Sequence, residues 1–437
     1  MTELLRLRDF GFRYFGSDKP IFSHLDLSLG PGQCTQLCGP SGSGKSTLLA
    51  CFQGGLGSAG ESQGECRLSV PSGLVLQDPS AQLVCDTVRR ELEFGLDNLD
   101  LSEAQRKRRM AALCAYFAIT PWLGASTAEL SFGQKQTLNL AAALALRPQV
   151  LLLDEPCAML DPVAARRLVD LLGHLQREQG LALVIASHTD GLYAPLSPRR
   201  LALGAASGSS LPCLSLAPPS PEPCPEPRLA PAPACPAPEL LSASHLSLRY
   251  GKSAPWVLDD LSLSLKAGSL TAVLGANASG KTTLLYALAG QNKTQTGRIK
   301  LARRAGRKVR LSLLPQQVQS LFSQDSVAKE LACVGIRPDQ FGAGAAEQLS
   351  DLLERHPLDL SCGQRQQLAL QMMLAQEPDI LLFDEPTIGL DQGQRAWLVA
   401  AMRQLAEQGR ALLFATHDRA FAGLADRQLT LFDGELL

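Results

Sequence analysis

Short apolar runs that end in glycine or in acidic residues recur along this chain. VLLLDE ends at Glu155, ILLFDE ends at Glu385, and LTAVL stands directly before Gly275. A short run that is apolar throughout predicts a strand covered on both faces of a parallel sheet. The pattern therefore predicts several buried strands in each half of the chain.

Helix-like runs lie between these predicted strands, as in VRRELEFGL and LSEAQRKRRMAALCAYFA. We expect helical insertions near residues 86–145 and 326–375. The alternation of strands and helices predicts an α/β fold with a mixed sheet in each half.

An internal repeat organises the chain. Four motifs occur twice in the same order, which chance does not produce. They begin at Arg13, Gly39, Leu130 and Leu151 in the first half, and at Arg249, Gly275, Leu360 and Leu381 in the second. We therefore expect two homologous units, 1–205 and 239–437.

Residues 206–238 separate the halves and are rich in Pro, Ala and Ser. Such a segment buries too little apolar surface to fold, so we expect a solvated, semi-extended linker. A Pro-rich ligand for a recognition domain is the alternative. Cys213, Cys224 and Cys235 recur every eleven residues there, which a low-complexity duplication explains as well as a soft-metal site does.

The overall charge is nearly balanced. Lys and Arg total 41 and Asp and Glu total 42, for a formal net charge of −1. The chain therefore lacks the broad positive field that attracts nucleic acid, and no nucleic-acid partner is expected, although this balance leaves room for a local basic patch. No apolar run approaches the length of a bilayer span, and the first residues do not resemble a signal peptide. We expect a cytosolic chain that reaches a membrane only through partners.

Two glycine-rich segments fit the pattern G-x-x-x-x-G-K-[ST], each between a strand-like and a helix-like run. The glycines allow backbone N–H groups to surround a phosphate at a helix N-terminus. The lysine is expected to reach the β- and γ-phosphates of a nucleotide, and the following Ser or Thr to hold Mg²⁺. The expected nucleotide-binding residues are Gly39, Pro40, Ser41, Gly42, Ser43, Gly44, Lys45, Ser46 and Thr47, and then Gly275, Ala276, Asn277, Ala278, Ser279, Gly280, Lys281, Thr282 and Thr283.

Two of the predicted strands end in a pair of acids. The first acid of each pair, Asp154 or Asp384, is expected to orient Mg²⁺. The second, Glu155 or Glu385, is expected to polarise the attacking water as a general base. A strand that ends in solvated acids is the alternative, but it does not explain the phosphate loop upstream.

The segments LSFGQ and LSCGQ lie upstream of these acids, and their serines precede the second acid by 24 residues. They resemble the signature motif of ATP-binding-cassette (ABC) proteins, whose Ser and Gly cap the γ-phosphate of ATP bound to the opposite module. The resemblance implies two P-loop ABC ATPase modules, each a RecA-like mixed-sheet core with an α-helical subdomain, packed head to tail around two MgATP. The matching residues are Ser131, Gly133 and Gln134, and Ser361, Gly363 and Gln364; Phe132 and Cys362 replace the usual Gly between them.

The same resemblance implies roles for further residues in both halves. They are Tyr14 and Tyr250 for stacking on adenine, Gln77 and Gln316 for sensing Mg²⁺ and the attacking water, Asp161 and Asp391 for the loop that crosses between modules, and His188 and His417 for contact with the γ-phosphate. The expected metal-binding set is Ser46, Gln77 and Asp154, and Thr282, Gln316 and Asp384.

The stretch LQDPSAQLVCDTVRRELEFGLDN, which contains Gln77, resembles the ATPases of energy-coupling-factor (ECF) importers. In that family it docks coupling helices of an integral-membrane T component, which associates with a small substrate-binding membrane protein. The resemblance implies a peripheral protein at the cytoplasmic face of the cell membrane that powers uptake of a vitamin, a vitamin precursor or a transition metal.

Two other classes of tandem ABC protein are alternatives. Those that act on ribosomes typically join their modules by a long charged helical pair, whereas the linker here is sparsely charged. Sugar-importer ATPases often have a degenerate second site, whereas both halves here keep the Lys, Gln, Asp, Glu and His of the motifs.

Overall fold

The computed structural model describes residues 3–17, 19–40, 42–158, 160, 162–187, 191–205, 212–216, 237–251, 254–276, 279–304, 306–336 and 352–437. The chain divides into two compact units, Met1–Pro223 (unit 1) and Cys224–Leu437 (unit 2). Each unit has an antiparallel sheet, a larger sheet that is mostly parallel, and helices.

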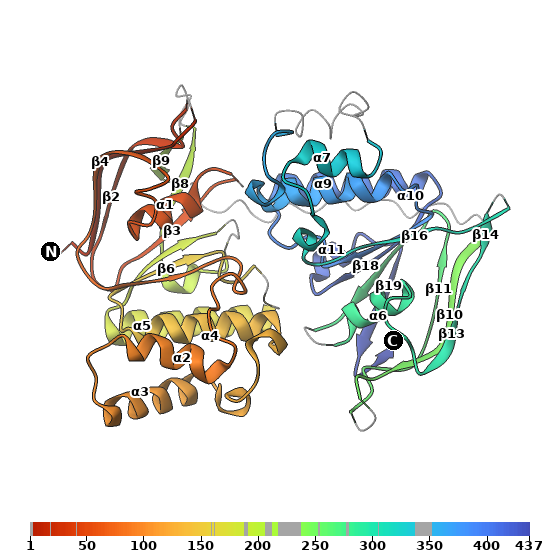
Figure 1. Ribbon diagram of the computed structural model, residues 1–437, viewed down its shortest axis with the longest axis horizontal. Helices are drawn as coiled ribbons and strands as arrows, with labels where there is room; N and C mark the ends of the chain where they lie inside the picture. Colours follow the sequence, from red (N-terminus) through yellow and green to blue (C-terminus); the bar gives the residue numbers. More distant parts are fainter. Residues whose placement is uncertain are drawn as a thin grey trace. The chain divides into compact units, whose positions relative to one another are not determined.

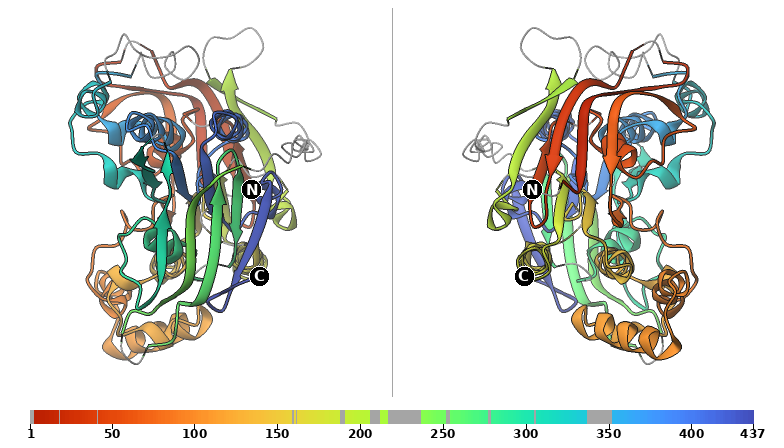
Figure 2. Two further views of the ribbon diagram at one scale, coloured as in Figure 1. Left: turned by 90° about the vertical axis from the view of Figure 1, so that its right-hand side faces the viewer. Right: turned by 90° about the vertical axis from the view of Figure 1, so that its left-hand side faces the viewer.

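The antiparallel sheet of unit 1 has the order β2-β1-β4 (Figure 2, right). Leu25, Leu27 and Leu29 of its second strand are buried and alternate with exposed polar residues, the pattern of a sheet with one face on the core. The edge strand β4 is mostly exposed. The strands are β1 (Leu5–Tyr14), β2 (Phe22–Leu29) and β4 (Gly60–Leu68).

Unit 2 repeats this sheet in the order β11-β10-β13 (Figure 2, left). Its strands are β10 (Glu239–Leu248), β11 (Leu258–Lys266) and β13 (Thr296–Leu301). A two-stranded hairpin of β14 (Arg303–Arg304) and β15 (Arg307–Lys308) follows β13. Unit 1 has only three residues, 69–71, between β4 and its next strand, so the hairpin is an insertion in unit 2.

The larger sheet has six strands and the same arrangement in both units. In unit 1 the spatial order is β5 (Ser72–Val75), β6 (Val150–Asp154), β7 (Ala182–Ala186), β3 (Cys34–Cys38), β8 (Arg199–Ala205) and β9 (Pro212–Leu216). In unit 2 it is β16 (Leu311–Leu314), β17 (Ile380–Asp384), β18 (Ala411–Thr416), β12 (Leu270–Leu274), β19 (Arg427–Phe432) and β20 (Glu435–Leu436). The first five strands of each sheet are parallel and the last is antiparallel.

The strands predicted from apolar runs are confirmed. Every residue of β6, β7, β17 and β18 is buried, because helices or the antiparallel sheet cover both faces of the larger sheet (Figure 1). The covering helices include α1 (Lys45–Phe52) and α5 (Pro162–Gln179) in unit 1, and α6 (Lys281–Leu288), α10 (Gln392–Glu407) and α11 (Arg419–Ala422) in unit 2.

The expected helical insertions are also present. In unit 1, α2 (Val88–Asp97), α3 (Glu103–Tyr116) and α4 (Phe132–Ala145) pack on one another (Figure 1). In unit 2 the described counterparts are α7 (Val327–Cys333) and α9 (Cys362–Leu374). Short 3-10 turns connect these helices, among them η1 (Thr120–Trp122), η2 (Thr127–Glu129), η4 (Val318–Leu321) and η6 (Pro357–Asp359), and η3 (Ala194–Leu196) precedes β8.

The expectation that the linker starts at residue 206 needs a correction. Pro212–Leu216 form β9, which pairs with β8 from Leu201↔Leu216 to Ala205↔Pro212. The strand is possible because Pro212 stands at its first position and the strand lies at the sheet edge, where a missing N–H is tolerated. The rest of the expected linker up to residue 236, including Cys224 and Cys235, lies outside the described residues.

No helix in the described part of the chain has the length and apolar character that crossing a bilayer requires.

Candidate functional site

The predicted site residues of each unit gather at one edge of the larger sheet. The phosphate loops follow β3 and β12, and the acid pairs follow β6 and β17. These strands are parallel to one another, so their carboxyl ends meet at the same edge, the usual ligand-binding edge of an α/β sheet.

Two glycines of the loop in unit 1 are required by its conformation. Gly39 has φ of 150°, and a Cβ there would lie 2.5 Å from the Leu203 carbonyl oxygen. Gly44 has φ of 95° immediately before α1, where other residues are strained. Gly280 repeats this with φ of 100° before α6. Both helices therefore begin with backbone N–H groups that no side chain caps.

The loop lysines are buried and bend back over their own loops. Lys45 Nζ donates to the carbonyl oxygens of Gly39 at 2.8 Å and Pro40 at 3.0 Å. Lys281 Nζ does the same with Gly275 at 2.8 Å and Ala276 at 3.0 Å. Each loop is thus a ring closed around an ammonium group, which places positive charge at its centre.

Each loop also contains a buried serine hydroxyl group. Ser43 Oγ and Ser279 Oγ are buried and make no hydrogen bond in the described part of the chain. An unsatisfied buried hydroxyl is costly, and a phosphate oxygen would satisfy it. Together with the ammonium group and the uncapped helix, these atoms fit a phosphate.

The first acid of each pair lies next to the hydroxyl group that follows the lysine. Thr282 Oγ1 donates to Asp384 Oδ2 at 2.8 Å, while Asp384 Oδ1 is buried without a hydrogen bond to any described residue. In unit 1, Ser46 lies close to Asp154. Burial raises the pKa of both aspartates to about 6, against the lowering effect of these hydroxyl groups. A hard divalent cation prefers oxygen ligands such as these.

The second acid of each pair has an uncommon backbone conformation. Glu155 has φ of 47° and Glu385 has φ of 48°, in the left-handed region that costs a non-glycine residue about 1–2 kcal/mol. The N–H of Glu155 donates to Ala186 O at 2.9 Å, and that of Glu385 to Ala415 O at 3.0 Å. These bonds turn the glutamates out of the strands while keeping them buried.

Contacts of both glutamate side chains are described, although His188, which corresponds to His417, lies outside the described residues. In unit 1, Ser187 Oγ donates to Glu155 Oε2 at 3.2 Å. In unit 2, His417 Nδ1 lies 3.0 Å from Glu385 Oε2, and Lys281 Nζ lies 3.4 Å from its Oε1. Burial lowers the pKa of His417, but the hydrogen bond and the charge of Glu385 outweigh burial and raise it.

The tyrosines expected to stack on adenine are oriented alike. Tyr14 OH lies 3.2 Å from Thr47 Oγ1, and Tyr250 OH lies 3.1 Å from Thr283 Oγ1. Tyr250 is 67% exposed, so its ring is accessible to a planar ligand next to the phosphate loop.

The signature serines begin helices. Ser131 caps α4 and Ser361 caps α9, each in a capping box with the Gln three residues later. Each hydroxyl accepts the N–H of that Gln, at 3.4 Å for Gln134 and 3.3 Å for Gln364. A side chain at Gly363 would collide with Gln394.

The glutamines Gln77 and Gln316 are half-buried just after β5 and β16, and neither makes a side-chain hydrogen bond with a described residue. Buried glutamates hold the segments that follow them: Glu91 Oε2 accepts the N–H groups of Val84 at 3.0 Å and Cys85 at 2.7 Å. Glu330 does the same for the N–H groups of Ser323 and Gln324.

Five predicted residues lie outside the described part of the chain: Ser41, Asp161, His188, Asn277 and Ala278. The sequence analysis did not predict three other residues near Glu155, namely Ser187, Tyr193 and Cys157. Ser187 precedes the expected His, and only its place after a strand could have drawn attention to it. Tyr193 is 1% exposed, and its hydroxyl lies next to Cys157 and Ser187 without a hydrogen bond to a described residue.

Known proteins share both halves of this arrangement. The chain matches the ABC transporter family over residues 22–158 and 258–388. A second family, an AAA domain described as putative AbiEii toxin, Type IV TA system, matches residues 125–194. Because the first match spans more than half of the chain, the chain belongs to the ABC transporter family, as a tandem ABC ATPase.

The similarity to relatives extends beyond these two segments. A putative ABC transporter ATP-binding protein of Bacillus thuringiensis subsp. konkukian is 32% identical, over 100% of this chain and 92% of its own length. A putative HMP/thiamine import ATP-binding protein of Bacillus subtilis is 30% identical, over 99% of this chain and 90% of its own length.

Solved structures share the fold. An RNase-L inhibitor is 19% identical with a TM-score of 0.64, over 98% of this chain and 89% of its own. A ribosome-bound archaeal Pelota and ABCE1 structure gives 18% identity and a TM-score of 0.73, over 98% of this chain and 78% of its own. At these identities the likeness concerns the fold alone.

Proposed function

We propose that this chain is the ATP-hydrolysing, energy-coupling subunit of an ECF-type importer, with membrane partners that carry the substrate. The observation that carries the proposal is identity of 30–32% along the whole chain with transporter ATP-binding proteins, one of them named for HMP/thiamine import. The cargo would be a micronutrient, and the partners a T component and a substrate-binding component.

The described contacts support a division of labour within each unit. The ring around Lys45 or Lys281 binds the phosphates, and the hydroxyl–carboxylate pair, Thr282 with Asp384 in unit 2, holds Mg²⁺. The bound cation would neutralise charge on the transferred phosphoryl group. Glu155 and Glu385 accept the proton of the attacking water, and their fixed backbone aims the carboxylate.

Each ATP site is completed, in this proposal, by the signature residues of the other unit. Ser361 and Gly363 would serve the site of Lys45, and Ser131 and Gly133 the site of Lys281. Helix α4 or α9 would point its N-terminus, where the helix dipole favours an anion, at the γ-phosphate. Closure on ATP and reopening after hydrolysis would then drive the membrane partner.

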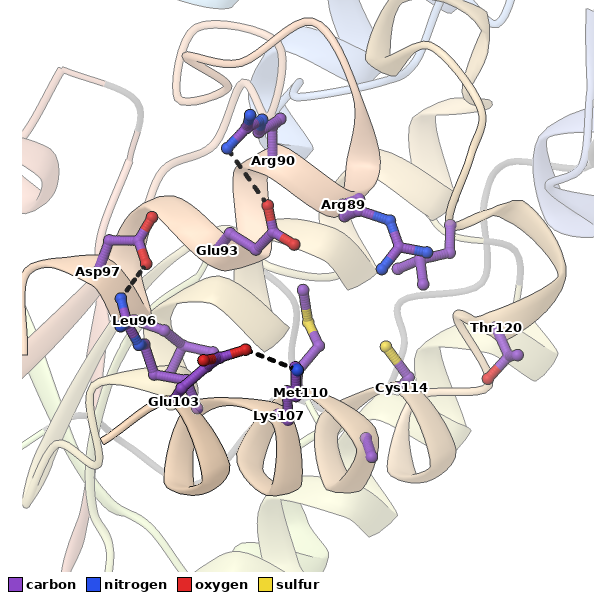
Figure 3. Close-up of a pocket in the computed structure, with 13 residues that line it drawn as sticks. Arg89, Arg90, Glu93, Leu96, Asp97, Glu103, Lys107, Met110, Cys114 and Thr120 are labelled. Carbon is purple, nitrogen blue, oxygen red and sulfur yellow. Dashed lines mark hydrogen bonds and ion pairs between the residues drawn. The ribbon is translucent and has the colours of Figure 1, made fainter. Parts of the chain in front are cut away.

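A pocket in unit 1 supports a docking site for the coupling helix of the T component. It has a volume of about 600 Å³ and lies between α2, α3 and the turn that follows (Figure 3). Its floor is apolar, with Leu96, Met110 and Cys114, and charged residues surround it. Three ion pairs lie on the rim: Arg90–Glu93 at 3.5 Å, Arg106–Asp97 at 2.8 Å and Lys107–Glu103 at 2.6 Å. An apolar floor with a charged rim suits an amphipathic helix.

Purification of the tagged chain from detergent-solubilised membranes tests the proposal. We expect two integral-membrane proteins to co-purify with it, and ATP turnover to rise on their assembly. The competing hypothesis is a tandem ABC protein that acts on ribosomes. A chain that sediments with ribosomes and never with membrane proteins would support that hypothesis and contradict the importer.

Neighbouring alanines on α3 give a matched pair of variants for the pocket. Ala111 lines the pocket, whereas Ala112 does not, and both are exposed. The larger side chain of Ala111→Trp would obstruct the pocket. We therefore expect this variant to reduce the yield of co-purified membrane partners at least ~10-fold, as the loss of a central anchor contact does. Ala112→Trp should leave the yield unchanged. Equal yields from the two variants would place the docking site elsewhere.

A further inference from the structure

A run of cations follows the edge strand of the antiparallel sheet in unit 2. Between residues 296 and 310 there are seven basic residues and no acidic one. We call them the basic strip: Arg298, Lys300, Arg303, Arg304, Arg307, Lys308 and Arg310. All seven are exposed. They belong to β13, to the hairpin β14–β15 beside it and to the residues that follow (Figure 1).

The hairpin places like charges opposite each other. Arg303 pairs with Lys308 and Arg304 with Arg307 across the two strands, an arrangement that is destabilising unless an anion is close. Asp379 supplies that anion on one side, with Arg307 at 2.6 Å and Arg304 at 3.7 Å.

On the other side of the hairpin, no described residue supplies such an anion. Arg303 and Lys308 form no ion pair with any described residue, and neither do Arg298 and Lys300 of β13. Four cations of the basic strip are thus left to an external partner.

Unit 1 shows that the fold does not require these charges. Its edge strand β4 carries Glu61, Glu65 and Arg67, and the hairpin is absent there. The net charge of the whole chain is −1, so a segment of fifteen residues with seven cations and no acid departs from a balanced background.

The strip also contains an exposed apolar residue and no aromatic one. Leu301 is 39% exposed, between Lys300 and Arg303. Cations around an exposed leucine are typical of a lipid interface. Single-stranded nucleic acid is usually bound with aromatic rings that stack on its bases, and residues 296–310 have none.

We propose that the basic strip binds the anionic headgroups of a lipid bilayer directly, without the membrane partners of the importer. Arg298, Lys300, Arg303 and Lys308 contact the phosphates, and Leu301 enters the interface. The proposal goes beyond the proposed function, because an importer subunit held only through its partners needs no lipid contact of its own.

Co-sedimentation of the full chain with protein-free vesicles tests it. We expect binding to vesicles that contain phosphatidylglycerol, little binding to pure phosphatidylcholine, and loss of binding at about 1 M salt, where the Debye length is about 3 Å. The variant with Arg298→Gln, Lys300→Gln, Arg303→Gln and Lys308→Gln should bind at least about 100-fold more weakly, since each such cation contributes a factor of about five. In a Leu301→Trp variant, anionic vesicles should shift the emission of the introduced indole to shorter wavelength.

A control removes equal charge from unit 1: Arg8→Gln, Arg108→Gln, Arg166→Gln and Arg167→Gln, four exposed cations without an ion pair to a described residue. It should keep vesicle binding. Equal weakening by both quadruple variants, equal binding to both lipid types, or displacement from vesicles by RNA at equal phosphate would overturn the proposal. Because the vesicles contain no protein, none of these outcomes depends on whether the importer partners exist.

Discussion

The two units have the same strand order and loop geometry but differ in the hydroxyl residue that ends the strand beside the conserved glutamate position, Ser187 in unit 1 and Thr416 in unit 2. In unit 1, Ser187 Oγ donates a hydrogen bond to the Glu155 carboxylate at 3.2 Å. In unit 2, Thr416 occupies that position and instead accepts the Asp418 N–H at 3.0 Å, while His417 contacts Glu385. The backbone that aims the glutamates is thus shared, whereas the hydroxyl side chain at the end of the neighbouring strand bonds the glutamate in unit 1 and the backbone in unit 2. Duplicated folds can therefore carry two unequal sites.

The largest effect should come from the glutamates. Glu155→Gln and Glu385→Gln keep the shape of the side chain and remove its basicity, so each should slow steady-state ATP turnover by at least ~10²-fold if both sites must fire in each cycle. If the Glu385→Gln variant hydrolyses ATP at the wild-type rate, the site of unit 2 is regulatory and only the site of unit 1 is active.

Replacing a buried aspartate should stabilise the protein. The pKa of Asp384 is raised from 3.8 to about 6 by burial, so the folded state binds the proton more tightly than the unfolded state. Stability therefore falls as pH rises from about 4 to about 6, by about 3 kcal/mol in all. Without nucleotide and divalent cation at pH 7.5, Asp384→Asn should recover up to about 3 kcal/mol.

Urea unfolding in a chelator measures this effect, which should vanish below about pH 4. The pKa of Asp154 is also raised to about 6, so Asp154→Asn should raise the free energy of unfolding in the same way. If only one of the two variants gains stability, the two aspartates differ between the sites.

The partners of the glutamates should show a smaller and unequal effect. His417→Ala removes a contact in which both the imidazolium and the Glu385 carboxylate can be charged, and should slow turnover about 10-fold. Ser187→Ala removes a hydrogen bond at 3.2 Å whose donor is uncharged, and should cost less. The pKa of His417 is raised by Glu385, so the loss should be largest at acidic pH and shrink as pH rises through that pKa. Rates across pH for the two variants decide this; an equal loss at all pH values would contradict it.

The smallest effect concerns a hydroxyl group present in unit 1 alone. Tyr193 OH is buried without a hydrogen bond to a described residue, whereas Phe421 is the buried ring that follows the corresponding strand of unit 2. Tyr193→Phe should therefore be neutral or stabilise by up to about 1 kcal/mol. Phe421→Tyr, the reciprocal change, should destabilise by about 1–3 kcal/mol. Thermal unfolding of both variants measures this, and a marked loss for Tyr193→Phe would reveal a partner for the hydroxyl.

The sequence was most informative about buried strands. A run such as VLLLD is apolar because both faces of β6 are covered. Burial of consecutive residues in one strand leaves a pattern that a short stretch of sequence shows by itself. The edge strand β9 was missed, because Pro212–Leu216 lies in a Pro-rich stretch and pairs on one side only. Edge strands lack the apolar signal that buried strands carry.

For the site, motif spacing predicted which residues meet at the sheet edge, and Lys281, Thr282, Asp384, Glu385 and His417 do meet there. Their roles toward a nucleotide stay predictions. The contact of Ser187 with Glu155 could not be read from the sequence, because it depends on a left-handed backbone at Glu155. In that conformation the Glu155 N–H donates to Ala186 O.

The helix caps at Ser131 and Ser361 have a consequence for which substitutions selection can remove during evolution. Capping uses the lone pairs of the hydroxyl group and leaves its hydrogen free to donate elsewhere. Aspartate or asparagine would cap these helices equally well, but ionised aspartate has no hydrogen to give. Drift from serine to aspartate would therefore leave the fold intact while removing one donor from the proposed nucleotide site. Purifying selection for a stable chain cannot detect that loss, and only selection for turnover can keep the serine.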